Sequence, residues 1–360
     1  MFHLLDSIIA RRTFEPSSIS LVRPTTYNPT YEEASNKHKA QRPHPIVLPT
    51  TPENQPKLEQ TTPPTMASTA AAKKKLVVCG GNGFLGSRIC KAAVARNWDV
   101  TSISRSGEPN WPSVSSHTSP PPWSKDVTWR SANILHPASY AKDLEGADAV
   151  VHSMGILLEA DYKGVLTGKE SPVAGLRRAF SSTKKGTSTN PLDRTSNDQP
   201  AEPGESDGQL TYELMNRDSA LILARAASSA SVPNFAYVSA AAGAPILPGR
   251  YISTKREAES LVASTFPKMR SLFIRPGFLY DSSRGFTVPM AAVTYGGFLA
   301  NSLTGGNLTW LMGAGGAKPL KADVVAQAVV EGLDDEGVKG PVEVKEIEEL
   351  ANRAWRRGML

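Results

Sequence analysis

The chain has 360 residues, a net charge of +6 and two cysteines, and 40% of its residues are apolar. This apolar content is enough to bury a large core, so most of the chain is expected to be globular. Cys79 and Cys90 cannot build a disulfide framework and match no metal spacing, so we interpret both as buried small side chains. The positive charge would permit binding to nucleic acid or an acidic membrane surface, but the basic residues are scattered without interleaved aromatics, which disfavours nucleic-acid binding as the main function.

Residues 1–72 are predicted to form a disordered tail, because this stretch is rich in Pro, Thr, Asn and Gln and has no sustained apolar period. Its first segment, MFHLLDSIIARR, has apolar residues at helical spacing followed by two arginines. Such a start, followed by Ser and Thr, favours a mitochondrial transit peptide. The alternative is an extension of the gene model, because Met66 lies just before the domain and could be the start.

From Lys73 to about residue 358 we predict one nucleotide-binding domain of the α/β class. Short apolar runs with β-branched residues alternate with segments of helical spacing. This alternation specifies a doubly wound parallel sheet with helices on both faces. Strands are expected over 75–80, 98–105, 126–134, 147–155, 234–240 and 270–277, and helices over 87–97, 212–230 and 251–264.

Two polar segments interrupt this alternation, residues 110–125 and 160–207. Both are rich in Pro, Ser and Thr and are too long for ordinary loops. We interpret both as surface insertions and expect the second to be flexible. Its end lies beside the expected cofactor crevice, so a lid is one interpretation, but an insertion without a role is favoured.

Three glycines, Gly80, Gly83 and Gly86, lie between the first strand and the first helix in the segment CGGNGFLGSR. The first permits a tight turn, the second lets the backbone approach a diphosphate, and the third lets the helix pack on the strand. The amides at the start of the helix then face the diphosphate. The sequence therefore predicts a dinucleotide site.

The end of the second strand is expected to select the cofactor. An acidic residue there would hold a ribose 2′-hydroxyl, but this chain has Ser104, Arg105 and Ser106. A guanidinium flanked by two hydroxyls can pair with a 2′-phosphate, which a carboxylate would repel. We therefore predict NADP(H), with NAD(H) as the alternative.

Tyr251 and Lys255 are four residues apart in the predicted helix YISTKREAE, so they share one face. A lysine ammonium near a phenol lowers the pKa of the phenol, and the pair is expected to make Tyr251 a proton donor or acceptor near neutral pH. Lys255 is also suited to hold ribose hydroxyls. The Tyr-x-x-x-Lys spacing alone is weak evidence for this role, and the stronger evidence is its position after the fifth strand.

The order of the glycine loop, ADAVVHSMG, YELMNRDSA, YVSAAAG, YISTKREAE, IRPGFLY and PLKADVVAQAVVEGL resembles the extended and atypical short-chain dehydrogenase/reductase superfamily. The resemblance covers residues 75 to about 335 and implies a Rossmann fold with a small C-terminal substrate lobe. Within the superfamily, the chain is most similar to fungal mitochondrial members associated with coenzyme Q biosynthesis. The NADPH-binding accessory subunit of respiratory complex I is a related group.

The resemblance implies catalytic roles for four residues. Tyr251 would be the acid/base, Lys255 its partner and a ribose ligand, Asn216 the helix asparagine, and Ser239 the serine after the fifth strand. Asn133 would stand where an acid usually contacts adenine. The implied cofactor contacts are Gly80, Gly83, Phe84, Leu85, Gly86, Ser104, Arg105, Ser106, Asn133, Ile134, Gly155, Lys255 and Pro276.

The chain departs from the family pattern after Ser239, where extended members commonly carry a run of serines. Ala240 and Ala241 stand there instead, and an alanine cannot orient a substrate carbonyl. Two functions therefore compete. One is an NADP(H)-dependent reductase acting on a carbonyl or hydroxyl, and the other is a non-catalytic, nucleotide-bound subunit of a membrane-associated mitochondrial complex.

Between Arg284 and Lys318 the chain has no charged residue. This segment follows the sixth strand, where the family builds its substrate lobe. Its Gly, Thr and Asn content disfavours a membrane span. A buried core segment is the favoured interpretation, followed by a pocket for an apolar substrate such as a quinone intermediate, and then by a patch in peripheral contact with the inner membrane.

Overall fold

The structure is a computed structural model that describes residues 72–115, 118–155, 190–193, 210–243, 249–284 and 287–359. All of them belong to one compact unit, Ser68–Leu360. The predicted tail with its transit peptide and Met66 lies outside the described residues. The predicted insertion at 160–207 also lies outside them, apart from 190–193.

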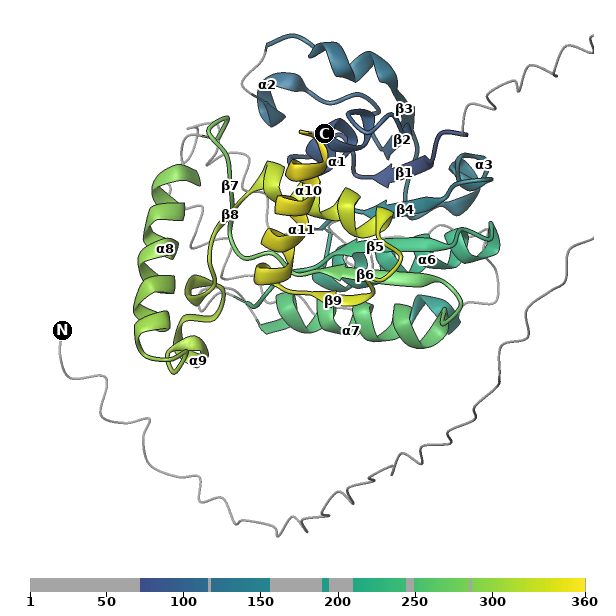
Figure 1. Cartoon of the computed structure of the whole chain (residues 1–360). Coiled ribbons are helices and arrows are strands. Elements are labelled where there is room, and N and C mark those ends of the chain that lie inside the picture. Colours follow the sequence, from purple (N-terminus) through teal and green to yellow (C-terminus); the bar gives the residue numbers. More distant parts are fainter. Residues whose placement is uncertain are drawn as a thin grey trace, which may run out of the picture. The chain divides into compact units, whose positions relative to one another are not determined.

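Seven parallel strands form the central sheet, in the order β3-β2-β1-β4-β5-β6-β9 (Figure 1). The chain reverses its direction of travel across the sheet between β1 and β4, and a doubly wound sheet opens a ligand crevice at this point, beyond the carboxyl ends of its strands. The predicted fold class is confirmed. The strands are β1 (Lys75–Cys79), β2 (Asp99–Ser104), β3 (Val127–Ser131), β4 (Ala149–His152), β5 (Asn234–Val238), β6 (Arg270–Ile274) and β9 (Gly340–Val342).

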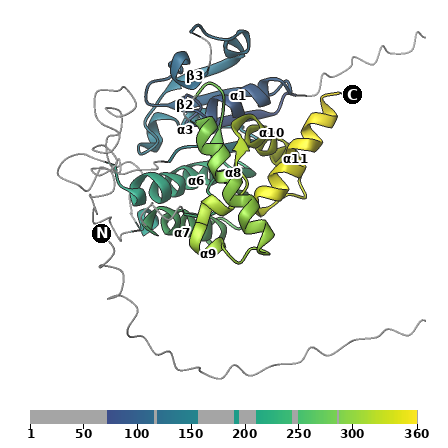
Figure 2. The same cartoon turned by 90° about the vertical axis from the view of Figure 1, so that its left-hand side faces the viewer.

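Helices cover both faces of this sheet (Figures 1 and 2). Residues of α1, α10 and α11 share one apolar cluster with the sheet, and residues of α3, α6 and α7 share the other. The α-helices are α1 (Gly86–Val94), α2 (Trp111–Val114), α3 (Ala141–Leu144), α6 (Ser219–Ser229), α7 (Gly249–Thr265), α8 (Thr287–Leu303), α9 (Thr309–Met312), α10 (Ala322–Asp334) and α11 (Val344–Arg357).

Shorter elements complete the described part of the chain. The segment η4 (Glu213–Asp218) is a π-helix that leads directly into α6. A second, two-stranded parallel sheet pairs β7 (Leu279–Tyr280) with β8 (Leu320–Lys321). The 3₁₀ segments are η1 (Pro122–Asp126), η2 (Pro137–Ser139), η3 (Pro191–Asp193) and η5 (Gly313–Gly316).

The first strand shows how the two cores are divided. Leu76 and Val78 join the cluster of α1, α10 and α11, whereas Val77 and Cys79 join that of α3, α6 and α7. Successive side chains of a strand point to opposite faces, so a strand buried on both sides must be apolar throughout. Cys79 is a free and buried thiol whose pKa is raised by burial, as expected for a packing side chain.

The segment 110–125 is anchored to the rest of the domain at α2 and η1. Its Trp111 is 5% exposed and packs edge to face on Trp123 and Trp129, with ring centroids 5.5 and 5.8 Å away. The predicted surface insertion therefore has buried anchor residues in α2 and η1, while most of its other described residues are exposed. Pairs of aromatic rings in this geometry contribute about 1 kcal/mol beyond their buried area.

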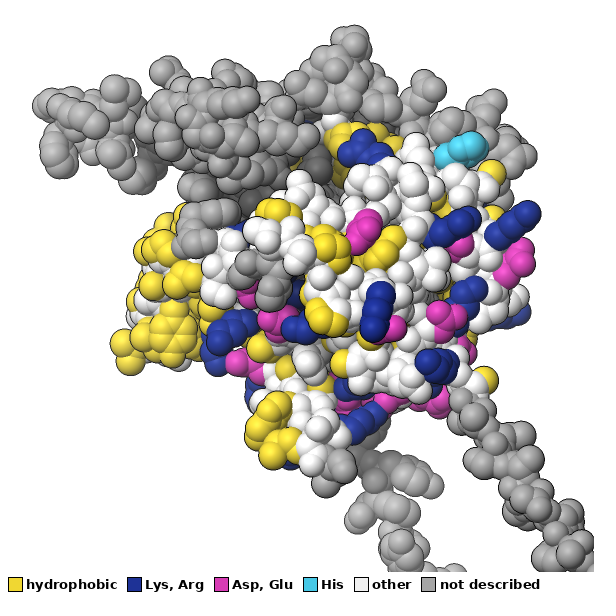
Figure 3. All heavy atoms as spheres, turned by 90° about the horizontal axis from the view of Figure 1, so that it is seen from above, with side chains coloured by type: hydrophobic (Ala, Val, Ile, Leu, Met, Phe, Trp, Pro, Cys, Tyr) yellow, Lys and Arg dark blue, Asp and Glu magenta, His cyan; other side chains and the backbone are white. Residues whose placement is uncertain are grey.

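The uncharged segment forms α8, which lies at the outside of the molecule (Figures 1 and 2). Only Thr287, Ala291 and Asn301 of this helix are buried among the described residues, so the favoured interpretation as a buried core segment is wrong. Apolar side chains gather at this edge in Figure 3. The large apolar side chains of α8 that are 44–89% exposed are Val288, Met290, Val293, Tyr295, Leu299 and Leu303.

In the part of the chain that the structure describes, no helix has both the length and the hydropathy that are needed to cross a bilayer. The α8 helix packs closely against η5, which belongs to the same uncharged segment. Gly297 lies so close to η5 that a Cβ would be 2.5 Å from the Gly315 carbonyl oxygen, and Asn301 donates to the Gly316 carbonyl at 3.3 Å. Glycine therefore permits this close crossing.

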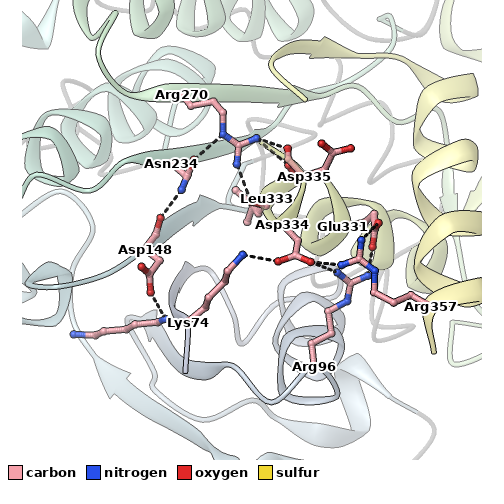
Figure 4. Close-up of polar contacts among 12 residues, drawn as sticks. Lys74, Arg96, Asp148, Asn234, Arg270, Glu331, Leu333, Asp334, Asp335 and Arg357 are labelled. Atoms are coloured by element: carbon pink, nitrogen blue, oxygen red, sulfur yellow. Dashed lines mark hydrogen bonds and ion pairs between the residues drawn. The ribbon is translucent and has the colours of Figure 1, made fainter. Parts of the chain in front are cut away.

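Ion pairs tie the C-terminal helices to the amino edge of the sheet (Figure 4). Lys74 Nζ lies 2.5 Å from Asp334 Oδ1, and Arg357 Nη2 lies 3.0 Å from Glu331 Oε1. Arg96 also contacts Glu331, whose side chain is 2% exposed. A cavity of about 480 Å³ lies beside this network, at the edge opposite the glycine loop, and is lined by Lys74, Trp98, Asp148, Asn234, Arg270, Leu333, Asp334 and Glu336 among others.

Candidate nucleotide site

The glycine loop connects β1 to α1 in a tight turn. Gly80 has a φ of +85°, a conformation that L side chains rarely adopt. Gly83 N donates to the Gly80 carbonyl at 2.9 Å. A Cβ on Gly86 would lie 2.1 Å from the same carbonyl oxygen, so only glycine allows α1 to begin this close to the loop.

Three backbone N–H groups at the start of α1 have no protein acceptor in the described part of the chain. They belong to Phe84, Leu85 and Gly86. The first N–H groups of a helix lie at the positive end of its dipole and form a binding site for an anion. These amides and the glycine turn fit the diphosphate of a dinucleotide.

The end of β2 holds an exposed arginine, Arg105, next to Ser106. Asn82 Nδ2 donates to Ser106 Oγ at 2.7 Å, so this hydroxyl keeps its own proton for a ligand. Ser104 is buried and donates its hydroxyl proton to the Gly107 carbonyl at 2.7 Å. The expectation of two hydroxyls available beside Arg105 is therefore wrong, because Ser104 closes the turn and only Ser106 remains.

The predicted adenine-side residues differ in what they offer. Asn133 is exposed, and its Oδ1 accepts a bond from Leu135 N at 3.2 Å, so its amide nitrogen is the group available to a ligand. Ile134 is 3% exposed, packs in the apolar core, and its carbonyl accepts from Tyr140 Oη. Pro276 is also buried, and its carbonyl accepts from Ala241 N at 2.8 Å.

Asn216, Lys255 and Gly155 come together beyond the ends of β4 and β5. A Cβ on Gly155 would lie 3.0 Å from Asn216 Oδ1 and 3.4 Å from Lys255 Nζ. Asn216 belongs to the π-helix η4, and its carbonyl accepts a bond from Tyr237 Oη at 2.6 Å. Short π-helical segments are frequent at functional sites, but helical spacing in a sequence does not reveal them.

Lys255 is 5% exposed and lies among aromatic rings. Its Nζ donates to the Val238 carbonyl at 3.2 Å and lies 5.2 Å from the centre of the Tyr237 ring and 5.8 Å from that of Tyr251. Burial lowers the pKa of Lys255 to about 8, against the opposing effect of the Glu259 carboxylate. A substantial neutral fraction is therefore present in the mildly alkaline range.

Tyr251 packs edge to face on Tyr212, with ring centroids 5.9 Å apart. Burial raises the pKa of Tyr251 to about 12, and the nearby Arg256 guanidinium opposes this rise. The expectation that Lys255 lowers this pKa toward neutrality is therefore wrong for the protein without a ligand, because loss of solvent outweighs the attraction of nearby cations. Tyr251 is protonated at neutral pH.

Ser239 is 4% exposed, and its hydroxyl oxygen accepts a bond from an arginine that the sequence did not point to. Arg256 Nη1 donates to Ser239 Oγ at 3.1 Å, and Nη2 donates to the carbonyls of Ala240 and Ala241 at 2.7 and 2.9 Å. Arg256 Nη1 also lies 2.6 Å from Glu259 Oε1. The only available signal was the adjacency of Arg256 to Lys255, and adjacency does not reveal a partner on another segment.

The chain is similar in sequence to several known proteins. Residues 76–163 match the model of the NAD dependent epimerase/dehydratase family. The chain is 37% identical over 232 residues to MIOREX complex component 2 of Saccharomyces cerevisiae, which covers 61% of this chain and 77% of that one. It is 26% identical over 293 residues, 77% of each chain, to an uncharacterized chloroplastic protein of Arabidopsis thaliana.

Solved structures with a similar course of the chain include two that contain NAD+. UDP-glucose 4-epimerase from Bifidobacterium longum, in complex with NAD+ and UDP, is 13% identical over 74% of this chain and 76% of that one, with a TM-score of 0.43. The enzyme WbmH of Bordetella bronchiseptica, in complex with NAD+, is 15% identical over 80% of this chain and 83% of that one, with a TM-score of 0.44.

Proposed function

Because this chain belongs to the NAD dependent epimerase/dehydratase family of short-chain dehydrogenase/reductase proteins, we propose that it binds NADP(H) and serves coenzyme Q biosynthesis in mitochondria as a reductase-like protein. One observation carries the nucleotide part of the proposal. The free amides of Phe84, Leu85 and Gly86 follow a glycine turn at the carboxyl edge of the sheet, where dinucleotides bind in this fold. The bound nicotinamide would supply or accept a hydride.

Each group around the crevice has a role in holding the nucleotide. The amides of the glycine loop would bind the diphosphate, and Lys255 would bind ribose hydroxyls. Arg105 and Ser106 would hold the 2′-phosphate, since both are exposed and residues 104–106 at the end of β2 include no carboxylate that would repel it. This charge at Arg105 supports NADP(H) over NAD(H).

The cofactor preference is tested by titrating the purified protein with NADPH and with NADH. We expect NADPH to bind more tightly, and Arg105→Glu to weaken NADPH by about tenfold or more while sparing NADH, because a carboxylate repels the 2′-phosphate. Lys142→Glu makes the same change of charge at an exposed residue of α3 and is expected to leave both affinities unchanged. Equal affinity of the wild-type protein for the two nucleotides contradicts the preference.

The proposed chemistry is reduction of a carbonyl, with Tyr251 as the proton donor. A phenol with a pKa of about 12 is protonated at physiological pH and can donate to a developing alkoxide. Tyr251→Phe removes this proton and leaves the packing on Tyr212. We expect nucleotide binding to persist in Tyr251→Phe, whereas the coenzyme Q content of mitochondria that carry only this variant falls. A normal content would contradict the catalytic role.

The mitochondrial and membrane parts of the proposal rest on three features. The relative in yeast is named as a component of a complex, the first residues have the pattern of a transit peptide, and α8 presents uncharged, exposed side chains that suit a membrane surface or a prenylated substrate. Flotation with liposomes that contain cardiolipin tests the last feature. Wild-type protein is expected to float, and Val293→Glu, a change at a 71% exposed residue, to float less.

A second candidate function is a non-catalytic subunit that keeps its nucleotide as a structural ligand. The observation that favours it is that Ala240 and Ala241 carry no hydroxyl and that Ser239, whose oxygen accepts a bond from Arg256, is only 4% exposed, so this loop presents little to a substrate carbonyl. In this case Tyr251→Phe would leave the coenzyme Q content normal, whereas Gly86→Ala, which closes the nucleotide site, would lower it.

A further inference from the structure

Arg88 contacts several separate parts of the chain from the first turns of α1. Its side chain is 9% exposed, and it follows the last glycine of the loop by two residues. The guanidinium reaches the glycine loop, the end of α2 at Val114, and the segment between β7 and α8. A planar guanidinium has five donors in a fixed arrangement, which suits simultaneous contact with several segments.

On the side of the glycine loop, Arg88 Nη1 donates to the Phe84 carbonyl at 2.7 Å. The carbonyl and the following N–H of a trans peptide point in opposite directions. The bond from Arg88 therefore fixes the direction of the Leu85 N–H, which is one of the free amides of the proposed diphosphate site. The Phe84 ring also lies 4.5 Å from the Arg88 guanidinium carbon.

The segment 281–284 and α8 together are called the α8 lobe below. On the side of this lobe, Arg88 Nη2 lies 2.7 Å from Asp281 Oδ1 and 3.2 Å from Ser283 Oγ. The segment 281–284 is joined to the start of α8, because Thr287 Oγ1 donates to the Arg284 carbonyl at 2.7 Å and accepts from Asp281 N at 3.1 Å. A continuous set of hydrogen bonds therefore runs from the glycine loop to α8.

Arg284 makes a further contact between the lobe and the glycine loop. Its guanidinium carbon lies 4.1 Å from the centre of the Phe84 ring, which the Arg88 guanidinium also contacts. Two cations, one from α1 and one from the lobe, therefore contact the same aromatic ring beside the free amides. The lobe therefore contacts the glycine loop through Arg284 on the Phe84 ring, and it contacts Arg88 through Asp281 and Ser283.

We propose that Arg88 is a positioning residue that couples nucleotide binding at the glycine loop to ordering of the α8 lobe. A diphosphate on the Leu85 amide holds the Phe84 peptide in place, and this peptide holds Arg88 against Asp281 and Ser283. Coupling between two sites is reciprocal, so a change in the lobe must alter nucleotide affinity. The coupling rests on the proposed nucleotide site and extends it to a part of the chain that does not touch the diphosphate.

The test uses the full chain and Asp281→Asn, which removes the lobe carboxylate and leaves the glycine loop intact. NADPH affinity is measured by titration, and amide hydrogen exchange is followed over residues 80–88 and 287–303 with and without NADPH. In wild-type protein NADPH is expected to slow exchange in both segments. In Asp281→Asn, NADPH is expected to bind about fivefold more weakly or worse and to slow exchange only over 80–88.

Asp323→Asn is the matched control, because Asp323 approaches the same arginine but lies 3.7 Å from its Nε with a side chain that is 52% exposed. This control is expected to behave as the wild-type protein does. If Asp281→Asn does not fold, Ser283→Ala replaces it, since it removes one bond to Arg88 and no charge. Wild-type affinity together with wild-type protection of 287–303 in the lobe variant would overturn the proposal.

The outcome also separates this inference from the proposed function. If the wild-type protein binds neither NADPH nor NADH, the proposed function fails. The coupling is then judged from the nucleotide-free exchange, in which Asp281→Asn is expected to speed exchange over 80–88 as well as over 287–303. Faster exchange in the lobe alone would show that Arg88 does not connect the two segments.

Discussion

Replacing Lys255 by methionine is expected to stabilise the nucleotide-free protein at neutral pH. Lys255 is 5% exposed, and its ammonium lies near the rings of Tyr237 and Tyr251, where it has lost most of its hydration. Methionine has a similar length and no charge, so it fills the same space without this cost. Lys255 therefore lowers stability at a position where its proposed role is to bind ribose.

The size of the effect follows from the pKa of Lys255, which burial lowers from 10.5 to about 8. Each unit corresponds to about 1.4 kcal/mol, so holding the charged form in the folded protein costs about 3 kcal/mol. Methionine also loses the bond from Lys255 to the Val238 carbonyl, which is worth about 1 kcal/mol. The net gain in the free energy of unfolding is expected to be about 2 kcal/mol at pH 7.

The stability advantage of Lys255→Met must fall as the pH rises. Below the folded pKa of about 8, Lys255 is charged in the folded and unfolded states, and the full cost is present. Between pH 8 and 10.5 the folded protein releases the proton while the unfolded chain keeps it, so wild-type stability rises relative to the variant. The advantage of Lys255→Met is therefore lost above pH 10.5, where the missing bond remains as a small disadvantage.

Urea denaturation of both proteins at pH 7, 9 and 10.5, followed by circular dichroism, measures this difference. Lys345→Met is the control, because its side chain is 89% exposed, and we expect it to change stability by less than about 0.5 kcal/mol. A Lys255→Met protein that is less stable than wild type at pH 7, or equally more stable at every pH, would refute the reasoning.

Further predictions concern the glycine loop and the amino edge of the sheet. Gly86→Ala places a Cβ 2.1 Å from the Gly80 carbonyl oxygen and is expected to abolish NADPH binding in a titration, whereas Gly296→Ala in α8 meets open space and is expected to bind normally. Glu331→Gln leaves the contacting arginines, Arg96 and Arg357, without their buried carboxylate. Both arginines keep their contact with Asp334, so the change is expected to lower the free energy of unfolding by about 1–3 kcal/mol, and an unchanged urea midpoint would contradict a stabilising role for the network.

Local patterns in the sequence predicted the six longest strands of the main sheet, but they missed β9. β1 and β5 are recognisable because each is a continuous apolar run, as both faces of a parallel sheet are covered by helices. β9 has only the residues Gly340–Val342 and no such run, and it forms because β6 offers it a free edge at Leu272–Ile274. A strand this short depends on its neighbour, which lies far away in the chain.

In the candidate site, too, some features follow from the local sequence and others from the tertiary structure. The strand, glycine turn and helix over 75–94, and the shared face of Tyr251 and Lys255, follow from the sequence by itself, because spacing within one element is local. The partners of these groups were decided by tertiary structure. Burial raised the pKa of Tyr251, Arg256 engaged Ser239, and α8 remained exposed, because solvent access and hydrogen-bond partners depend on segments that only folding brings together.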